Sequence, residues 1–187
     1  MNILKGIVAT DPNGIIGSAG TIPWSIKEDF AFFKHITCGN VLIMGHTTYK
    51  TLDKPLKGRY TIVLSSQAQY QPTYINLEEN TQVHWCADKP AAYRLAQRLM
   101  NTHRCDTFIC GGVRVYTDFL QSISEFYVTK VLQEYDGDTD IRHILDAIHG
   151  WDWQKLFDIQ KLATVYRAVD KRDHNYVVKF DTKKDRD

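Results

Sequence analysis

In three segments of this 187-residue chain, an apolar run is followed by residues that could bind a phosphorylated ligand. In Met44–Thr48 and in Cys110–Tyr116 a strand-like run passes through glycine into a helix start, where free backbone N–H groups and the helix dipole favour an anion. Arg114 adds a positive charge to the second segment, and the third, Leu64–Ser66, ends in two hydroxyl groups. Ligands of open α/β sheets bind at the carboxyl ends of the strands. The three segments therefore predict a phosphate-binding edge.

Asp29 is the acidic residue whose position points most clearly to chemistry. It lies on the same predicted helix face as Ile26 and Phe33, whereas Glu28 falls on the opposite face. Acidic residues in a first helical turn often only complement the helix dipole, and this explains Glu28. An ionised carboxylate among phenylalanines, however, loses hydration unless a partner compensates it. A bound cationic or amidine-like heterocycle would be such a partner for Asp29.

The sequence gives no support to several other classes of site. It contains no GxSxG, HExxH or GxxxxGK[ST] motif, and neither glycine segment matches GxGxxG. The cysteines lack the spacing of a zinc site or a redox pair, so we expect reduced thiols and no metal. They are Cys38, Cys86, Cys105 and Cys110.

The overall charge and the length of the apolar runs limit where the protein can be located in the cell and what kind of partner it can bind. Lys plus Arg number 23 against 22 Asp plus Glu, which argues against nucleic-acid or anionic-membrane binding. No run approaches the roughly 18 apolar residues of a membrane span, and the N-terminus lacks a signal-peptide core. We expect a cytoplasmic protein with a small-molecule ligand.

The elements that must position these residues alternate between strands and helices. Four continuous apolar runs are typical of strands covered on both faces, at 3–9, 41–44, 60–64 and 107–110. Helical spacing starts at Ile26, which Ser25 would cap, and two further helices are expected at 90–100 and 115–120. This alternation predicts one α/β domain over residues 1–187, with a central mixed, mainly parallel sheet flanked by helices.

The last third of the chain has a different pattern. Residues 126–131 and 175–180 resemble strands, 162–168 is a weaker candidate, and 170–173 would form a turn. We expect a C-terminal antiparallel hairpin that closes one edge of the sheet, and a frayed tail at about 182–187.

In their order and spacing these segments resemble the dihydrofolate reductase family along nearly the whole chain. The matching pieces include Gly14–Gly17, Ile22–Trp24, Asp29–Phe30, Ile43–Gly45, Gly58–Arg59, Leu64–Ser66, Gly111–Gly112, Arg114–Tyr116, Thr129 and Gly137–Thr139. The resemblance implies an enzyme that transfers hydride from NADPH to dihydrofolate, giving tetrahydrofolate for one-carbon metabolism and for thymidylate and purine synthesis. It also implies a monomer that binds antifolate inhibitors.

The resemblance assigns roles on the substrate side. Asp29 would hold the pterin and, with Thr129 and an ordered water, promote its protonation, while Trp24 would help to order that water. Arg59 would bind the glutamate carboxylate of folate, although a surface salt bridge is the ordinary use of such a residue. The remaining wall of the substrate pocket would comprise Ile7, Val8, Phe30, Phe33, Leu52, Leu56 and Cys110.

The resemblance also assigns the cofactor side, with a lid formed by residues 10–22. The implied cofactor-binding residues are Ala9, Ile16, Gly17, Gly45, His46, Thr47, Thr48, Leu64, Ser65, Ser66, Gly111, Gly112, Val113, Arg114, Val115 and Tyr116. In the family a cis peptide joins the two glycines at 111 and 112. The chain departs from the family pattern at His46–Thr47, where a basic residue for the cofactor is usual, so we expect the preference for NADPH over NADH to depend on pH.

Two alternatives stay open at this point. A pyrimidinone reductase of the riboflavin pathway is related in fold, but it would need neither Asp29 on the helix face nor Arg59. A catalytically silent folate- or nucleotide-binding protein would keep the pockets without turnover, and the presence of Asp29, Trp24 and Thr129 counts against it.

Overall fold

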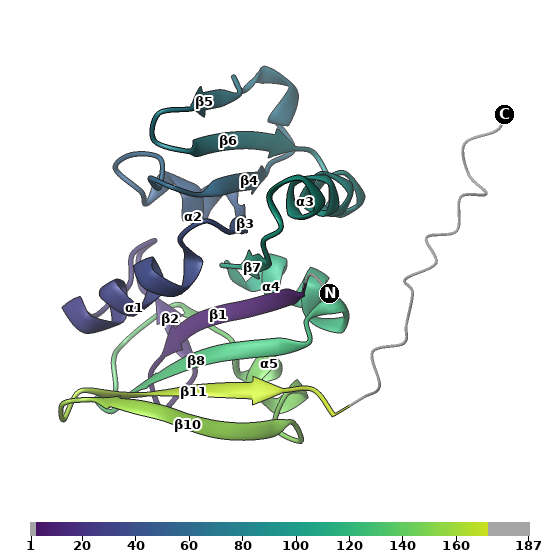
Figure 1. The fold of residues 1–187 in the computed structure, drawn as a ribbon. Coiled ribbons are helices and arrows are strands. Elements are labelled where there is room, and N and C mark those ends of the chain that lie inside the picture. The colour runs from purple at the N-terminus through teal and green to yellow at the C-terminus, as the bar shows by residue number, and fades with distance from the viewer. Residues whose placement is uncertain (1–2, 172–187) are drawn as a thin grey trace, which may run out of the picture.

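A nine-stranded mixed sheet organises the computed structural model, which describes residues 3–171. Figure 1 shows the strands stacked from β5 at the top to β10 at the bottom. In spatial order they are β10 (Asp152–Ile159), β11 (Ala163–Val169), β8 (Glu125–Val131), β1 (Leu4–Thr10), β7 (Thr107–Ile109), β3 (Val41–Gly45), β4 (Tyr60–Leu64), β6 (Thr81–Cys86) and β5 (Tyr74–Asn76). The pairings from β8 to β6 are parallel and those at the two edges antiparallel, which confirms the predicted mixed, mainly parallel sheet.

Helices cover both faces of this sheet. They are α1 (Lys27–Thr37), α2 (His46–Lys50), α3 (Lys89–His103), α4 (Val113–Phe119) and α5 (Arg142–Ala147), with single 3-10 turns η1 (Ala68–Tyr70) and η2 (Leu120–Ser122). In β3, Ile43 packs in the core formed with α3, α4 and α5, whereas Leu42 and Met44 pack toward α1. Figure 1 accordingly places α1 and α3 on opposite sides of the sheet. No helix within residues 3–171 is both long and apolar enough to cross a membrane.

The helix starts agree with the sequence at α3 and differ from it at α1. Asp88 caps α3 by accepting a hydrogen bond from the Ala91 N–H, and a proline occupies its first turn as expected. The predicted cap of α1 by Ser25 is wrong, because α1 begins at Lys27 and its capping position is Ile26, without a side-chain hydrogen bond. The two acidic residues of the first turn complement the dipole there instead.

The expected hairpin exists, but it uses another strand. β11 confirms the weaker candidate at 162–168, and its hairpin partner is β10, which the sequence pattern did not predict. β10 is mostly exposed along its length, so it lacks the apolar run that marks the inner strands. The other candidate strand at 175–180 and the tail at 182–187 lie outside the described residues, as does the second half of the predicted turn at 170–173.

Gly6 of β1 leaves room for the buried ring of Phe126 on the paired strand β8. A Cβ atom added to Gly6 would lie 2.5 Å from Cε2 and Cζ of Phe126, which is fully buried on the paired strand. We expect Gly6→Ala to lower the free energy of unfolding by about 1–3 kcal/mol, because the ring has no free space to move into. Thermal melting checks this, with Gly150→Ala as the matched control, since nothing lies within 4 Å of that added Cβ. Equal melting temperatures for both variants would contradict the packing argument.

Candidate active site

A cleft of about 1350 Å³ lies at the carboxyl ends of the central parallel strands. Its walls include residues from the ends of β1 and β3, the residue after β7, and Thr129 of β8. A single drug-sized ligand fills roughly 300–1,000 Å³, so this cleft is large enough for a cofactor and a substrate side by side. Every residue that the sequence predicted for the site lines this cleft except Trp24.

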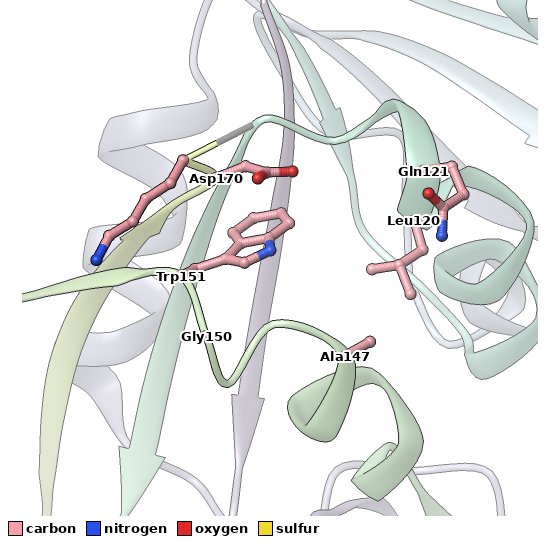
Figure 2. Close-up of a pocket in the computed structure, with 7 residues that line it drawn as sticks. Leu120, Gln121, Ala147, Gly150, Trp151 and Asp170 are labelled. Carbon is pink, nitrogen blue, oxygen red and sulfur yellow. The ribbon is translucent and has the colours of Figure 1, made fainter. Parts of the chain in front are cut away.

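A second, smaller hollow of about 300 Å³ contains none of the predicted site residues. It is lined by Leu120, Gln121, Ala147, Gly150, Trp151, Asp170 and Lys171. In Figure 2 Asp170 and Trp151 lie close together on one side of this hollow, and Leu120 and Gln121 on the other. The candidate chemistry is therefore confined to the larger cleft.

Asp29 projects into the cleft from the first turn of α1. Its Oδ1 accepts a 2.6 Å hydrogen bond from the Thr129 hydroxyl of β8, and no cation pairs with it within residues 3–171. Burial raises the pKa of Asp29 above its ordinary value, and the opposing effect of the Thr129 hydrogen bond does not cancel this. The cleft thus contains a carboxylate held in place by one neutral donor and able to accept a hydrogen bond, or donate a proton, at its other oxygen.

Trp24 lies one layer behind the cleft wall. It is 6% exposed and packs in a cluster that includes Ile26, Val131 and Val165. Its ring meets that of Tyr135 at a centroid distance of 5.3 Å. Ala9, which does line the cleft, packs against the same cluster. Trp24 thus adjoins the cleft at Ala9, and its role in ordering a water stays a prediction.

Arg59 is a buried cation on the cleft wall, only 4% exposed. Its Nη2 donates to the carbonyl of Lys34 at 2.8 Å, its Nε donates to the Thr37 hydroxyl at 3.4 Å, and its Nη1 donates to the carbonyl of Lys57. All three acceptors are neutral, and no carboxylate among residues 3–171 pairs with the guanidinium. The surface salt bridge is therefore wrong for Arg59, and the cleft presents an uncompensated positive charge.

The glycine pair follows β7 where α4 begins. The Gly111–Gly112 peptide is cis, as the resemblance implies, and the Gly111 carbonyl accepts a hydrogen bond from the Gly45 N–H at 2.8 Å. Gly111 has a φ of +100°, which disfavours any residue with a side chain. Tyr116 packs against it and donates its hydroxyl hydrogen to the Ile7 carbonyl at 2.7 Å. These contacts join β1, β3 and α4 at one corner of the cleft.

His46 is the first residue of α2 and directly follows Gly45 on the cofactor side of the cleft. Its Nδ1 lies 3.4 Å from the Ser65 hydroxyl, and its ring meets the edge of Trp85 at a centroid distance of 5.3 Å. Arg114, the other predicted cation, is 94% exposed and lies 3.8 Å from Asp118. His46 is therefore the ionisable group on the β3–β4 part of the cofactor side.

Residues 11–22 form a loop over the cleft that a second, small sheet holds in place. In this sheet β2 (Ile15–Gly17) pairs with β9 (Thr139–Asp140), and the Ala19 N–H donates to Asp138 Oδ2 at 3.0 Å. The loop contributes Ile16 and Gly17 to the cleft, as predicted.

Several cleft residues were missed from the sequence. They are Lys34, Met44, Thr51, Lys54, Pro55, Lys57, Ala87, Asp88, Lys89, Pro90, Asp118 and Thr139, whereas Gly20, Thr21 and Ile22 belong to the predicted lid. Those at 87–90 come directly after β6, which was not predicted as a strand. In the sequence Thr81, Val83 and Trp85 alternate with the polar residues Gln82 and His84, and this alternation was the available signal.

Comparison with known proteins agrees with the site. A family model described as dihydrofolate reductase matches residues 3–176. The dihydrofolate reductase of Schistosoma mansoni is 32% identical over 82% of this chain and 81% of its own, and that of Enterococcus faecium is 32% identical over 73% and 75%. A solved dihydrofolate reductase from Enterococcus faecalis, complexed with NADP(H) and RAB-propyl, is 27% identical, covers 91% of this chain and 97% of its own, and superposes with a TM-score of 0.65. With a carboxylate and a buried guanidinium in one cleft beside the glycine pair, the chain belongs to the dihydrofolate reductase family.

Proposed function

We propose that this cleft reduces dihydrofolate to tetrahydrofolate with NADPH, and that Asp29 is the only ionisable group at the pterin ring. The observation that carries the proposal is the carboxylate of Asp29, which has Thr129 as its hydrogen-bond donor and no cation beside it in the described part of the chain. A pterin presents an amidine edge to such a group, and paired charge-assisted hydrogen bonds then compensate its buried charge. A pyrimidinone reductase has no need of this carboxylate.

The cofactor side of the cleft has the donor set that NADPH requires. Hydroxyls of Thr48, Ser65 and Ser66 and the exposed guanidinium of Arg114 line it, and all of them can donate to phosphate oxygens. A Cβ at Gly112 would lie 3.5 Å from the Thr48 hydroxyl, so these two cleft residues are close neighbours on the cofactor side. When bound, NADPH supplies the hydride, and the nicotinamide wall is assigned to Ala9, Ile16 and Tyr116.

In this proposal the protein's own residues promote protonation of the substrate and align the reactants. Asp29 holds the amidine edge and promotes protonation at the ring nitrogen beside the reduced bond, while Thr129 fixes the carboxylate. Trp24, which packs with Ala9, is assigned to help order the water that takes part in this protonation. Apolar side chains of Ile7, Phe30 and Phe33 exclude bulk water, which strengthens the electrostatic contacts inside the cleft.

The glutamate tail is assigned to Arg59. Four hydrogen bonds to three neutral partners already hold the guanidinium plane, and one N–H hydrogen, on Nη1, is left to donate to a ligand at little entropic cost. A carboxylate would also compensate a charge that no residue of the described chain neutralises.

Loss of NADPH absorbance on addition of dihydrofolate tests the proposed function. A ribosyl-aminopyrimidinone substrate and buffer alone provide the comparison arms. Turnover with the pyrimidinone and none with dihydrofolate would overturn the proposal, and tight folate binding without turnover would identify a silent binding protein. We further propose that the protein is cytoplasmic, that it is a monomer and that antifolates occupy the substrate half of the cleft. Sedimentation tests the monomeric state, and competition with dihydrofolate tests where antifolates bind.

Discrimination between NADPH and NADH is expected to grow by roughly tenfold as pH falls from about 8 to about 6. His46 lies beside Ser65 on this side of the cleft, whereas Arg114 is paired with Asp118 and the Lys89 ammonium donates to the Asp118 carbonyl. A protonated imidazole attracts the 2'-phosphate that distinguishes the two cofactors.

The ratio of the two dissociation constants, measured by fluorescence titration across this range, checks the prediction. His46→Ala provides the baseline because the phosphate itself titrates in the same range, and His46→Arg should keep high discrimination at every pH. Parallel curves for the wild type and His46→Ala would show that another residue binds the phosphate.

A further inference from the structure

Asp11 is a buried carboxylate that the proposed reaction does not use. It directly follows β1 and is 3% exposed. Its Oδ1 accepts the backbone N–H groups of Asn13 at 2.9 Å and Ile15 at 2.8 Å, and its Oδ2 accepts the N–H of Tyr135 at 3.0 Å. No cation within residues 3–171 pairs with it. Two amide hydrogens from its own loop and one from Tyr135, far along the chain, therefore hold this carboxylate in place.

One oxygen of Asp11 organises the loop over the cleft. Besides the bond to its side chain, Ile15 accepts the Asp11 N–H on its carbonyl at 3.1 Å, so the two residues are linked in both directions. Ile15 in turn packs on Gly137, where an added Cβ would lie 2.3 Å from its Cγ2. The next residue, Ile16, lines the cleft. The placement of Ile16 thus depends on a bond made at Asp11.

The other oxygen organises the region behind Asp29. It fixes the backbone of Tyr135, whose ring packs on Trp24 at 5.3 Å with an interplanar angle of 55°. Trp24 shares its cluster with Val131, which lies two residues beyond Thr129 on β8. Asp11 therefore supports, through Tyr135, the packing beside the Asp29–Thr129 pair.

We propose that Asp11 is a positioning residue for hydride transfer. Its two oxygens link the loop that carries Ile16 to the loop that carries Tyr135, and so set the nicotinamide wall and the pterin wall relative to each other. The inference rests on the proposed function, because the roles of these two walls are the ones assigned above. It adds a residue that touches neither ligand but aligns the groups that do.

Asp11→Asn is the sharpest test because it keeps the shape and removes one acceptor. The amide oxygen can still accept the two loop N–H groups, whereas its –NH2 would face the Tyr135 N–H, and two donors cannot bond. We expect single-turnover hydride transfer to slow by about tenfold, while the dissociation constants of NADPH and dihydrofolate change by less than about twofold. Amide hydrogen exchange at Tyr135 should become faster.

Asp106→Asn is the matched control for loss of stability. Asp106 also accepts a backbone N–H, that of Ile3 at 3.0 Å, and pairs with Lys5 at 2.9 Å, but it lies at the other end of the strands. This variant should melt earlier and transfer hydride at the wild-type rate. If Asp11→Asn likewise changed only the melting temperature, Asp11 would be structural and the proposal would be overturned.

A second variant keeps the proposal testable if Asp11→Asn folds poorly. Tyr135→Leu keeps the backbone bond to Asp11 and removes the ring from Trp24, and it should slow hydride transfer without weakening either ligand. Additive losses in the double variant would contradict an action of Asp11 through Tyr135.

One readout is independent of turnover. The near-ultraviolet circular dichroism of Trp24, taken as the difference from Trp24→Phe, should change in Asp11→Asn. A wild type that does not reduce dihydrofolate would refute the proposed function. An unchanged Trp24 signal in Asp11→Asn, together with unchanged amide exchange at Ile15 and Tyr135, would refute the role of Asp11 whether or not the wild type reduces dihydrofolate.

Discussion

Asp29→Asn is expected to lower the rate of hydride transfer to dihydrofolate by about 10²–10⁴-fold at neutral pH. Asparagine can still accept the Thr129 hydrogen bond, so the local geometry survives, but it cannot move a proton or compensate a protonated pterin. The rate should recover in part at low pH, where solvent protonates the substrate directly. Pre-steady-state hydride transfer measured across pH checks this, and near wild-type transfer at neutral pH would remove Asp29 from the mechanism.

The same variant should make the ligand-free protein more stable at neutral pH. Burial raises the pKa of Asp29, so the folded protein binds this proton more tightly than the unfolded chain does. The contribution of Asp29 to stability is therefore favourable in acid and is lost as pH rises through its folded-state pKa. The melting temperature of Asp29→Asn should exceed that of the wild type at neutral pH and converge with it below the ordinary aspartate value of 3.8. A lower melting temperature of Asp29→Asn than of the wild type at neutral pH would show that the carboxylate stabilises the fold.

Arg59→Lys is expected to weaken binding of glutamate-bearing folates by roughly 10²-fold, equivalent to about 2–3 kcal/mol. Lysine keeps the charge but loses the planar fork, and its three ammonium hydrogens cannot satisfy the Lys34 and Lys57 carbonyls, the Thr37 hydroxyl and a ligand together. A pterin that lacks the glutamate tail should bind within about threefold of the wild-type affinity. Isothermal titration with both ligands measures the two affinities.

Thr37→Val is the matched control for Arg59. It removes one acceptor of the guanidinium and leaves the charge in place, so the loss for the glutamate-bearing folate should be smaller than in Arg59→Lys. Because Arg59 also holds the end of α1, both variants should melt earlier than the wild type. Equal weakening of the two ligands by Arg59→Lys would mean that Arg59 acts on the whole cleft through the fold rather than on the tail.

Local sequence patterns determined the inner architecture and most of the cleft. Val41–Met44 is fully apolar because β3 is covered on both faces, and this is visible without any knowledge of its neighbours. Once the inner strands are parallel, the residues that follow them must meet at one edge, so Gly45, Ser65 and Gly111 come together as predicted. Helical spacing likewise places Asp29 and Phe33 on the face of α1 that meets the cleft.

Only the tertiary structure decided features that depend on partners distant in sequence. β10 has an exposed pattern and becomes a strand because β11 pairs with it, while Trp24 lies behind the wall because residues of β8 and β11 enclose it. The sequence around Arg59 gives no sign that the hydrogen-bond acceptors of its guanidinium are three neutral groups, two of them on α1. The bond from Tyr135 to Asp11 joins residues 124 positions apart. Such contacts require the folded sheet to bring the segments together, and no local periodicity records them.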